Sequence, residues 1–196
     1  MLYYLSKLLI KKMTENILKT QKVVNFGPSG RAVAQPMDVG LLDNLFEHLT
    51  MERYANVQYF SNYLWFKERD LTGFASFFLS ESQGEIEHAQ KFADYLIARG
   101  QNVKLKELPE PIQTWDSIEA LISYAFNMEA DLTSSLQQLY SISERISDTR
   151  TNVFLDPIVD AQTNSEDEFA HILGKVKFAN KQPSAVLLID SDLNKK

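Results

Sequence analysis

Four ionisable side chains stand where three predicted helices should be apolar. Glu85 and His88 lie three positions apart, so a helix would place a carboxylate and an imidazole one turn apart on one face. Glu52 and Glu129 interrupt two other series of apolar residues spaced by three and four positions. An ionised carboxylate buried without a partner is so costly that it is either protonated or paired. No Lys or Arg lies on these predicted faces, so a bound cation is the simplest partner.

The amino-acid composition indicates which cation such a cluster would hold. The chain has no cysteine and 3 histidines, which excludes disulfides, thiolate zinc sites, iron–sulfur clusters and cysteine nucleophiles. The ligands must then be mostly carboxylate oxygens, which favour hard or borderline ions such as iron or manganese. Inward-facing glutamates and a histidine from several helices match the pattern of two metal ions bridged by carboxylates inside a helical bundle.

A second Glu-x-x-His motif, from Glu168 to His171, competes for the role of metal ligand. Gln162 and Phe169 belong to the predicted apolar face of that helix. At 3.6 residues per turn, Glu168 precedes Phe169 by about 100° and His171 follows it by about 200°. We therefore predict that Glu168 and His171 face the surface or a cavity. Gln162 would contribute to the site instead, with Ser165 one turn further on.

Other side chains are candidates for supporting roles. Tyr59 follows Glu52 by two turns, so it is either a core tyrosine with a satisfied hydroxyl or a hydrogen-bond or one-electron donor beside the metals. Glu81 precedes Glu85 by one turn and could be a supporting group or a mobile ligand that passes metal onward. The weaker candidates are His48, predicted to be exposed; Trp65 and Trp115, predicted to be core or boundary residues; and Asp148, Asp156 and Asp160, predicted to be solvated or to line a cation path.

Periodic apolar residues predict the elements that must position these side chains. The loop-forming segment 27–36 holds two prolines and two glycines, and the fold is predicted to begin just after it. The spacing then predicts an all-α bundle of four long helices and a short fifth one, over about 38–68, 73–100, 116–143, 148–180 and 184–189.

The ends of the predicted helices carry their own signals. Asp116, with Glu119 three positions later, predicts the start of the third helix, and Gly100 predicts the end of the second. Pro157 marks either the start of the fourth helix or a kink within it. The connection over 101–114 is longer than the roughly 2–8 residues usual between neighbouring bundle helices. We therefore predict a crossover that runs along the length of the bundle.

Length and charge complete the prediction. A chain of 196 residues, 44% hydrophobic and 23% charged, is typical of one globular domain. We predict an N-terminal extension and loop (1–37), a four-helix bundle (38–182) and a short helix with a tail (183–196). The net charge of −6 argues against nucleic acid as a partner. No apolar run reaches the ~20 residues of a membrane span, and residues 2–10 make a poor secretion signal. We expect a cytoplasmic protein without stable membrane association, in which residues 1–26 are a leader or extension and Met13 is a second possible start.

With these residues the chain resembles the ferritins, in particular the bacterial non-haem ferritins and most closely those of cyanobacteria. The resemblance covers about residues 27–192, and its segments are specific only when taken together. They are Met51-Glu52-Arg53-Tyr54-Ala55 with Tyr59, Glu85-x-x-His88-Ala89 with Tyr95-Leu96, Met128-Glu129-Ala130, Phe154-Leu155-Asp156-Pro157 with Gln162, and Val176-Lys177-Phe178-Ala179-Asn180.

The resemblance implies a ferritin-like four-helix bundle and a hollow cage of twenty-four identical subunits that oxidises Fe(II) with O₂ and stores the ferric mineral. It implies that Glu52, Glu85 and His88 hold a first iron, and that Glu85 and Glu129 hold a second. The supporting residues that it implies are Gln162, which would order a water or dioxygen, Tyr59 as the site tyrosine, Glu81 in iron transit or alternative coordination, and Asp156 near an ion path.

Some residues depart from the family's patterns. Ile86 stands where bacterioferritins carry a haem-ligating methionine, and Gln162 and Ser165 replace the glutamate and histidine of their fourth helix. We therefore expect no haem. Ala161 and Ser165 replace glutamates that hold a third iron in many bacterial ferritins, which puts that third site in doubt.

Two rival functions share this sequence pattern. A di-iron oxidase or peroxidase of the same fold could use the same ligands on another substrate, although such enzymes often carry two Glu-x-x-His motifs. A storage subunit without an oxidation site is the other rival, and the intact set of Glu52, Glu85, His88 and Glu129 argues against it.

Overall fold

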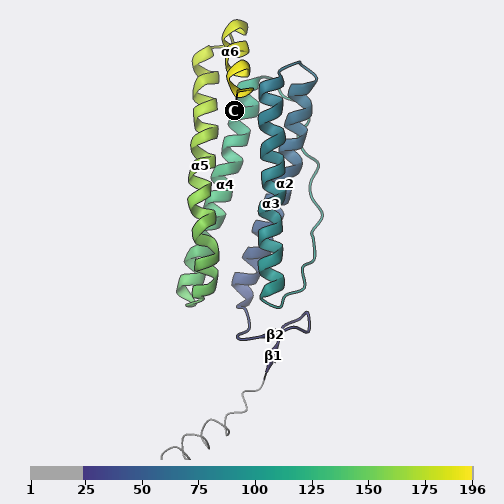
Figure 1. The fold of residues 1–196 in the computed structure, drawn as a ribbon, viewed down its shortest axis with the longest axis vertical. Helices are drawn as coiled ribbons and strands as arrows, with labels where there is room; N and C mark the ends of the chain where they lie inside the picture. Colours follow the sequence, from purple (N-terminus) through teal and green to yellow (C-terminus); the bar gives the residue numbers. More distant parts are fainter. Residues whose placement is uncertain (1–23, 196) are drawn as a thin grey trace, which may run out of the picture.

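The computed structural model describes residues 24–195, and helices dominate this range (Figure 1). The four long helices are α2 (Val39–Lys67), α3 (Thr72–Ala98), α4 (Ile118–Arg145) and α5 (Thr149–Ala179), and the short α6 (Pro183–Leu193) follows them. A two-stranded hairpin of β1 (Asn25–Phe26) and β2 (Ala32–Val33) precedes the bundle. The predicted all-α bundle with a short fifth helix is confirmed. Residues 1–23, which hold Met13 and most of the predicted leader, lie outside the described range.

Most predicted helix boundaries agree with the structure to within a few residues. Asp38 and Asp148 are the N-caps of α2 and α5, and their side chains accept hydrogen bonds from Leu41 N and Thr151 N. The prediction for α4 was wrong by one residue, because the N-cap is Ser117, whose hydroxyl accepts from the N–H of the residue three positions on. Pro157 lies inside α5, two turns beyond its first residue, and not at its start.

The predicted crossover between α3 and α4 is confirmed. This connection runs along the outside of the bundle for most of its length (Figure 1). Two polar side chains buried on α2 hold it in place at Ile112. The amide of Gln58 donates to Ile112 O at 2.9 Å and accepts from Ile112 N at 2.8 Å, and the Ser61 hydroxyl donates to the same carbonyl at 2.9 Å. These bonds satisfy backbone groups that no helix or sheet satisfies.

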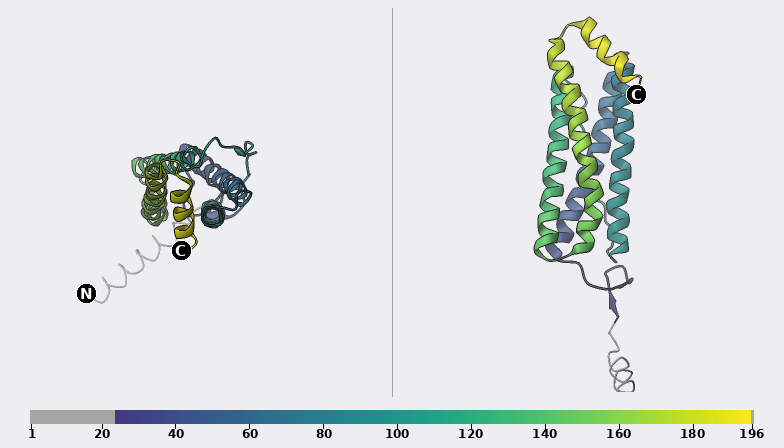
Figure 2. Two further views of the ribbon diagram at one scale, coloured as in Figure 1. Left: turned by 90° about the horizontal axis from the view of Figure 1, so that it is seen from above. Right: turned by 60° about the vertical axis from the view of Figure 1, so that its left-hand side comes forward.

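Seen along the bundle axis, the four long helices surround a common centre (Figure 2). Their buried residues form two apolar groups. The aromatic cluster includes Tyr59, Phe66, Phe74, Phe78 and Phe169, and the leucine cluster includes Leu41, Leu45, Leu96, Leu136 and Leu155. Each long helix also carries a buried polar residue on its inward face: Glu52, Glu85, Glu129 and Gln162. The predicted ligands therefore occupy a polar layer inside an otherwise apolar core.

Helix α6 closes one end of the bundle, where it crosses toward the start of α3 (Figure 2). The N-cap position of α3, Leu71, has no capping side chain. Asp190 of α6 serves instead, because its Oδ1 accepts a hydrogen bond from Phe74 N at 2.9 Å. The backbone of α6 also lies against Gly73, where an added Cβ would come within 1.8 Å of Asp190 O. Glycine at this position therefore permits the close approach of the two helices.

The hairpin β1–β2 lies at the opposite end of the bundle from α6 (Figure 1). It corrects the prediction of a plain loop over residues 27–36, because two-residue strands carry no periodic signal that a sequence could reveal. Ser29 joins the hairpin to the end of α3, since its N–H and its hydroxyl both donate to Gly100 O, at 3.1 and 2.9 Å. Gly30 and Gly100 both have positive φ angles, of 76° and 79°, as these turns require.

Candidate metal centre

Helices α2 and α3 bring three of the predicted ligands together. Glu52, Glu85 and His88 each offer one ligand atom, and these atoms all lie within 4.8 Å of one another. His88 Nδ1 lies 3.2 Å from Glu85 Oε2 and 3.8 Å from Glu52 Oε2. Both carboxylates are buried, while the imidazole is partly exposed. The three residues predicted to hold the first iron therefore form a compact group.

The fourth predicted ligand, Glu129 of α4, lies outside that 4.8 Å group but faces the same polar layer. Its side chain is fully buried and accepts two hydrogen bonds. The Tyr59 hydroxyl donates to Oε1, and the Gln162 amide donates to Oε2 at 2.8 Å. These two donors, from α2 and α5, orient the Glu129 carboxylate, so all four long helices contribute to the polar layer.

Burial raises the pKa values of the acids in this layer. It raises the pKa of Glu85 to about 8, against the effect of the hydrogen bond with His88. It raises the pKa of Glu129 to about 7, with a further contribution from the charge of Glu85. The pKa of Glu52 is raised by burial too, and that of His88 is raised chiefly by its hydrogen bond with Glu85. Burial is thus the main obstacle to ionising these acids, and a bound cation would favour their charged forms.

One oxygen of this group lacks any hydrogen-bond partner. Glu52 Oε2 is buried, receives no hydrogen bond, and faces His88 Nδ1. A buried carboxylate oxygen without a donor is unfavourable unless something else compensates its charge. Carboxylate oxygens with an imidazole nitrogen are a donor set that suits iron. The residues present therefore fit a bound iron ion.

The structure places Glu81 and the second Glu-x-x-His motif around this group. Glu81 is half-buried, and burial, followed by the charge of Glu168, raises its pKa to about 8. Glu168 is itself half-buried, so it faces inward more than a surface residue would. His171 is exposed, as the helical phase predicts. The second motif therefore does not bring an imidazole to the polar layer.

His48 corrects the sequence-based prediction of an exposed side chain. The residue is fully buried, with Nδ1 at 2.9 Å from Ser135 Oγ and Nε2 at 2.9 Å from Glu52 Oε1. Its ring packs against Phe92 with a centroid separation of 4.5 Å. Burial lowers the pKa of His48 to about 3, so the imidazole is neutral. The spacing of four residues from Glu52 was the signal that could have revealed this contact.

With the geometry in view, comparison with known proteins assigns the family. A family model described as the ferritin-like domain matches residues 42–179, which span α2 to α5. The chain belongs to the ferritin family. It is 25% identical over 154 residues to the bacterial non-heme ferritin of Escherichia coli O6:H1, covering 79% of this chain and 93% of that protein. Its identity to the bacterial non-heme ferritin of Campylobacter jejuni is 28% over 146 residues, 74% of this chain and 87% of the relative.

Solved ferritin structures share the fold. The open pore ferritin of the archaeon Archaeoglobus fulgidus superposes with a TM-score of 0.79 at 26% identity, covering 83% of this chain and 99% of that chain. The similarity therefore spans the whole of that ferritin subunit, including the elements that form the polar layer.

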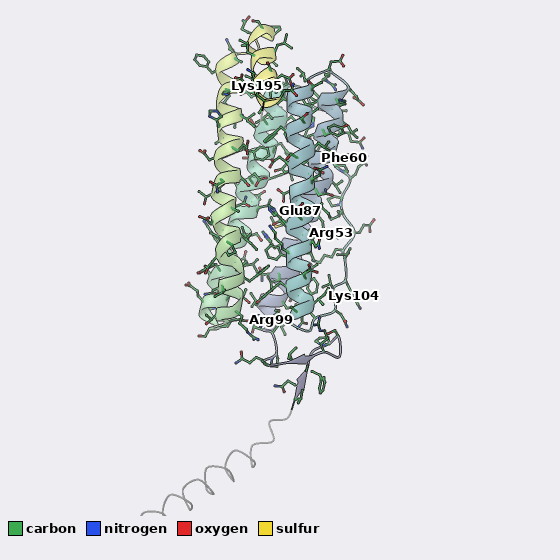
Figure 3. All side chains as sticks on the ribbon, in the orientation of Figure 1. Arg53, Phe60, Glu87, Arg99, Lys104 and Lys195 are labelled. Atoms are coloured by element: carbon green, nitrogen blue, oxygen red, sulfur yellow. The ribbon has the colours of Figure 1, made fainter. Side chains whose placement is uncertain are left out.

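Two of the three acidic candidates at the start of α5 accept hydrogen bonds from other side chains. Asp148 accepts two hydrogen bonds, at 2.6 and 3.2 Å, from the guanidinium of Arg99, the residue labelled at the end of α3 in Figure 3. This pair joins the end of α3 to the start of α5. Asp156 is exposed and accepts a hydrogen bond from the Tyr140 hydroxyl at 2.9 Å. Asp160 is also exposed. Of the three, Asp148 is therefore already paired with a cation from the chain itself.

The two tryptophans lie where the sequence predicted. Trp65 is buried in the aromatic cluster, and Trp115 is half-buried at its edge. Within residues 24–195, this ferritin has no helix that is both long enough and apolar enough to cross a lipid bilayer.

Proposed function

We propose that this protein oxidises Fe(II) with O₂ at a two-iron site and stores the ferric product inside a hollow assembly of identical subunits. The observation that carries the proposal is the group of Glu52, Glu85 and His88, in which a buried carboxylate oxygen has no hydrogen-bond partner. Membership of the ferritin family supports iron as the metal. In this reaction iron is the substrate, because each ion is oxidised and then moves on to the store.

Each residue of the polar layer has a proposed role. Glu52, Glu85 and His88 bind the first Fe(II), and Glu85 and Glu129 bind the second, so that Glu85 bridges the two ions. The hydrogen bonds from Tyr59 and Gln162 hold Glu129 in one orientation. In the proposal, Gln162 also orients a water or dioxygen at the second iron. No residue of this set supplies a haem ligand in the proposal.

The oxidation requires two electrons and two protons for each O₂. Two Fe(II) ions supply the electrons, O₂ accepts them, and two protons complete hydrogen peroxide, leaving two Fe(III) ions. Carboxylate oxygens stabilise Fe(III) more than Fe(II), because Fe(III) is the harder ion. The same preference would retard the release of the product, so a further acid beside the site is useful. Glu81, one turn before Glu85, is the proposed next ligand on the way to the store.

The proposed assembly is the cage of twenty-four subunits that the resemblance implies. Apolar side chains are exposed on both helices at the α6 end of the bundle, where Phe178 is 94% exposed and Leu188 is 69% exposed. Apolar patches exposed on a single subunit often mark its contacts with another subunit. The similarity to known ferritins supports an assembly of identical subunits, and the number twenty-four rests on the resemblance alone.

A single titration tests the proposal. Fe(II) is added anaerobically to the purified protein, bound iron is counted, O₂ is admitted, and the particle mass is measured by light scattering. We expect two Fe(II) per subunit, one O₂ consumed per two Fe(II), and a particle far larger than the 22.5 kDa subunit. A stable monomer, or a protein that binds no Fe(II), would contradict the proposal. Consumption of O₂ only when an organic substrate is added would favour the rival di-iron oxidase.

A further inference from the structure

A buried histidine beside the polar layer has no part in the proposed reaction. His48 is fully buried on α2, one turn before Glu52 and next to the polar layer. Its two ring nitrogens face different partners on different helices. Nδ1 lies 2.9 Å from the hydroxyl of Ser135 on α4, and Nε2 lies 2.9 Å from Oε1 of Glu52. The imidazole therefore bridges α4 and a proposed metal ligand.

The chemistry of the two partners determines where the imidazole proton lies. When a bound cation keeps Glu52 ionised, its carboxylate can only accept hydrogen bonds, so Nε2 must carry the proton that faces Glu52. Nδ1 of the neutral ring then accepts the hydroxyl proton of Ser135. The atoms of His48 and Glu52 are at hydrogen-bonding distance, although their angle is not that of a well-formed bond. The donation proposed below requires the Glu52 carboxylate to align with Nε2–H.

The two oxygens of Glu52 have different surroundings. Oε1 is next to His48 Nε2, while Oε2 has no hydrogen-bond partner and lies 3.8 Å from His88 Nδ1. Because His48 occupies the Oε1 side, only Oε2 is available to an ion held by Glu85 and His88. The ring of His48 also packs against Phe92 at 4.5 Å, which restricts its rotation.

We propose that His48 is a positioning residue for the metal site. Its Nε2–H holds Glu52 Oε1, so that Oε2 points at the ion, and Ser135 fixes the ring in the tautomer that can donate. The inference rests on the proposed function, because it needs Glu52 to be a ligand. Residues that orient a ligand by hydrogen bonding typically contribute about 10- to 100-fold to metal affinity. The same range is expected for His48.

Co(II) binding to the iron-free protein tests the role without any catalytic turnover. Affinity, stoichiometry and visible absorption are measured for the parent and for three variants, His48→Phe, His48→Gln and Ser135→Ala. His48→Phe retains a ring against Phe92 but removes both hydrogen bonds, and it should weaken the tightest Co(II) by about 10- to 100-fold. His48→Gln retains an N–H donor and should recover most of that loss. His171→Phe, at an exposed histidine, is the matched control and should bind as the parent does.

Each outcome decides between alternatives. Parent-like affinity in His48→Phe overturns the inference, and so does the loss of one bound Co(II) per subunit, since His48 would then be a ligand itself. A His48→Gln variant as weak as His48→Phe shows that an N–H donor at this position does not restore binding, and also overturns it. If His48→Phe does not fold, Ser135→Ala decides, because unchanged affinity there contradicts the role of Ser135. A parent that binds no Co(II) refutes the metal site, and the role of His48 with it.

Discussion

Asp190 caps a helix that begins more than a hundred residues before it in the chain. Its carboxylate accepts a hydrogen bond from the backbone N–H of Phe74 at 2.9 Å, in the first turn of α3. An acidic side chain at this end of a helix also interacts favourably with the helix dipole. The position of α6 is therefore fixed by a specific bond as well as by apolar packing.

We expect Gly73→Ala to destabilise the protein, because the new Cβ would come within 1.8 Å of the backbone oxygen of Asp190. Overpacking of this kind costs about 1–3 kcal/mol. Gly174→Ala is the control, since a Cβ there meets nothing within 4 Å and replaces a glycine inside α5. That change should stabilise the protein by up to about 1 kcal/mol. The free energy of unfolding in guanidinium tests both, and a Gly73→Ala variant as stable as the parent would show that α6 does not pack this closely.

Tyr59→Phe is expected to remove a tyrosyl radical formed when O₂ reacts with the iron-loaded protein. Oxidation of a phenol by one electron releases a proton, and Glu129 already accepts a hydrogen bond from the Tyr59 hydroxyl. Samples frozen rapidly after O₂ addition are examined by electron paramagnetic resonance. Tyr63→Phe, one turn further along α2, is the control and should retain the signal. A radical of full intensity in Tyr59→Phe would assign it to another residue.

The two Glu-x-x-His motifs should respond differently to loss of their histidines. His88→Ala removes a proposed ligand and should slow the first phase of Fe(II) oxidation by more than ~10-fold, since even residues that merely support a ligand contribute about 10- to 100-fold. His171→Ala removes an exposed imidazole and should leave the rate unchanged. Stopped-flow absorbance gives both rates. A severe defect in His171→Ala would mean that α5 presents a different face to the iron.

Glu81→Ala should separate iron binding from iron release. Three glutamates and an imidazole remain to hold two Fe(II) per subunit, so binding and the first oxidation should match the parent. Later additions of two Fe(II) per subunit should react more slowly, because the oxidised product leaves less readily without the next ligand. Glu87→Ala, an exposed glutamate on the same helix (Figure 3), is the control. Parent-like kinetics of Glu81→Ala through several additions would refute a role in transfer.

Asp148→Asn should lower stability at neutral pH but have little effect in acid. Burial acts to raise the pKa of Asp148, but the hydrogen bond and charge of Arg99 outweigh it, so the folded-state pKa is lower than usual. The stabilisation is therefore present above about pH 4, the unfolded value, and is lost as the pH falls through the folded value.

At pH 7 we expect Asp148→Asn to lower the free energy of unfolding by about 1–3 kcal/mol, because it leaves the buried Arg99 without its charged partner. Breaking a fully buried ion pair would cost about 3–5 kcal/mol. Asp156→Asn, at an exposed aspartate in the same helix, is the control. Thermal unfolding of both variants is compared with the parent between pH 7 and pH 3. A deficit that stays constant over this range would mean that the ion pair is not its source.

The helices and their inward faces could be predicted from the sequence, because apolar residues recur every three or four positions along each of them. Glu52, Glu85, Glu129 and Gln162 were predicted to face the core on this basis, and all four are buried. The same periodicity indicated that His171 would be exposed.

What the sequence could not reveal depends on contacts between distant segments. Helix α2 packs against both α3 and α4, so its buried face is wider than a single apolar stripe and includes His48 and Gln58. Gln58 is polar and buried because it binds the backbone of the crossover, and no local pattern encodes that partner. Asp190 likewise binds Phe74 although the two residues are 116 positions apart in the chain.

The long connection between α3 and α4 divides the chain into two helical hairpins, α2 with α3 and α4 with α5. Contacts within a hairpin are local in sequence, whereas contacts between hairpins require closure of a longer loop, so local pairs form faster during folding. Glu52, Glu85 and His88 all belong to the first hairpin. A nascent chain that has reached Ala98 therefore already holds every residue of the compact ligand group, before the half of the molecule that carries Glu129 has been synthesised.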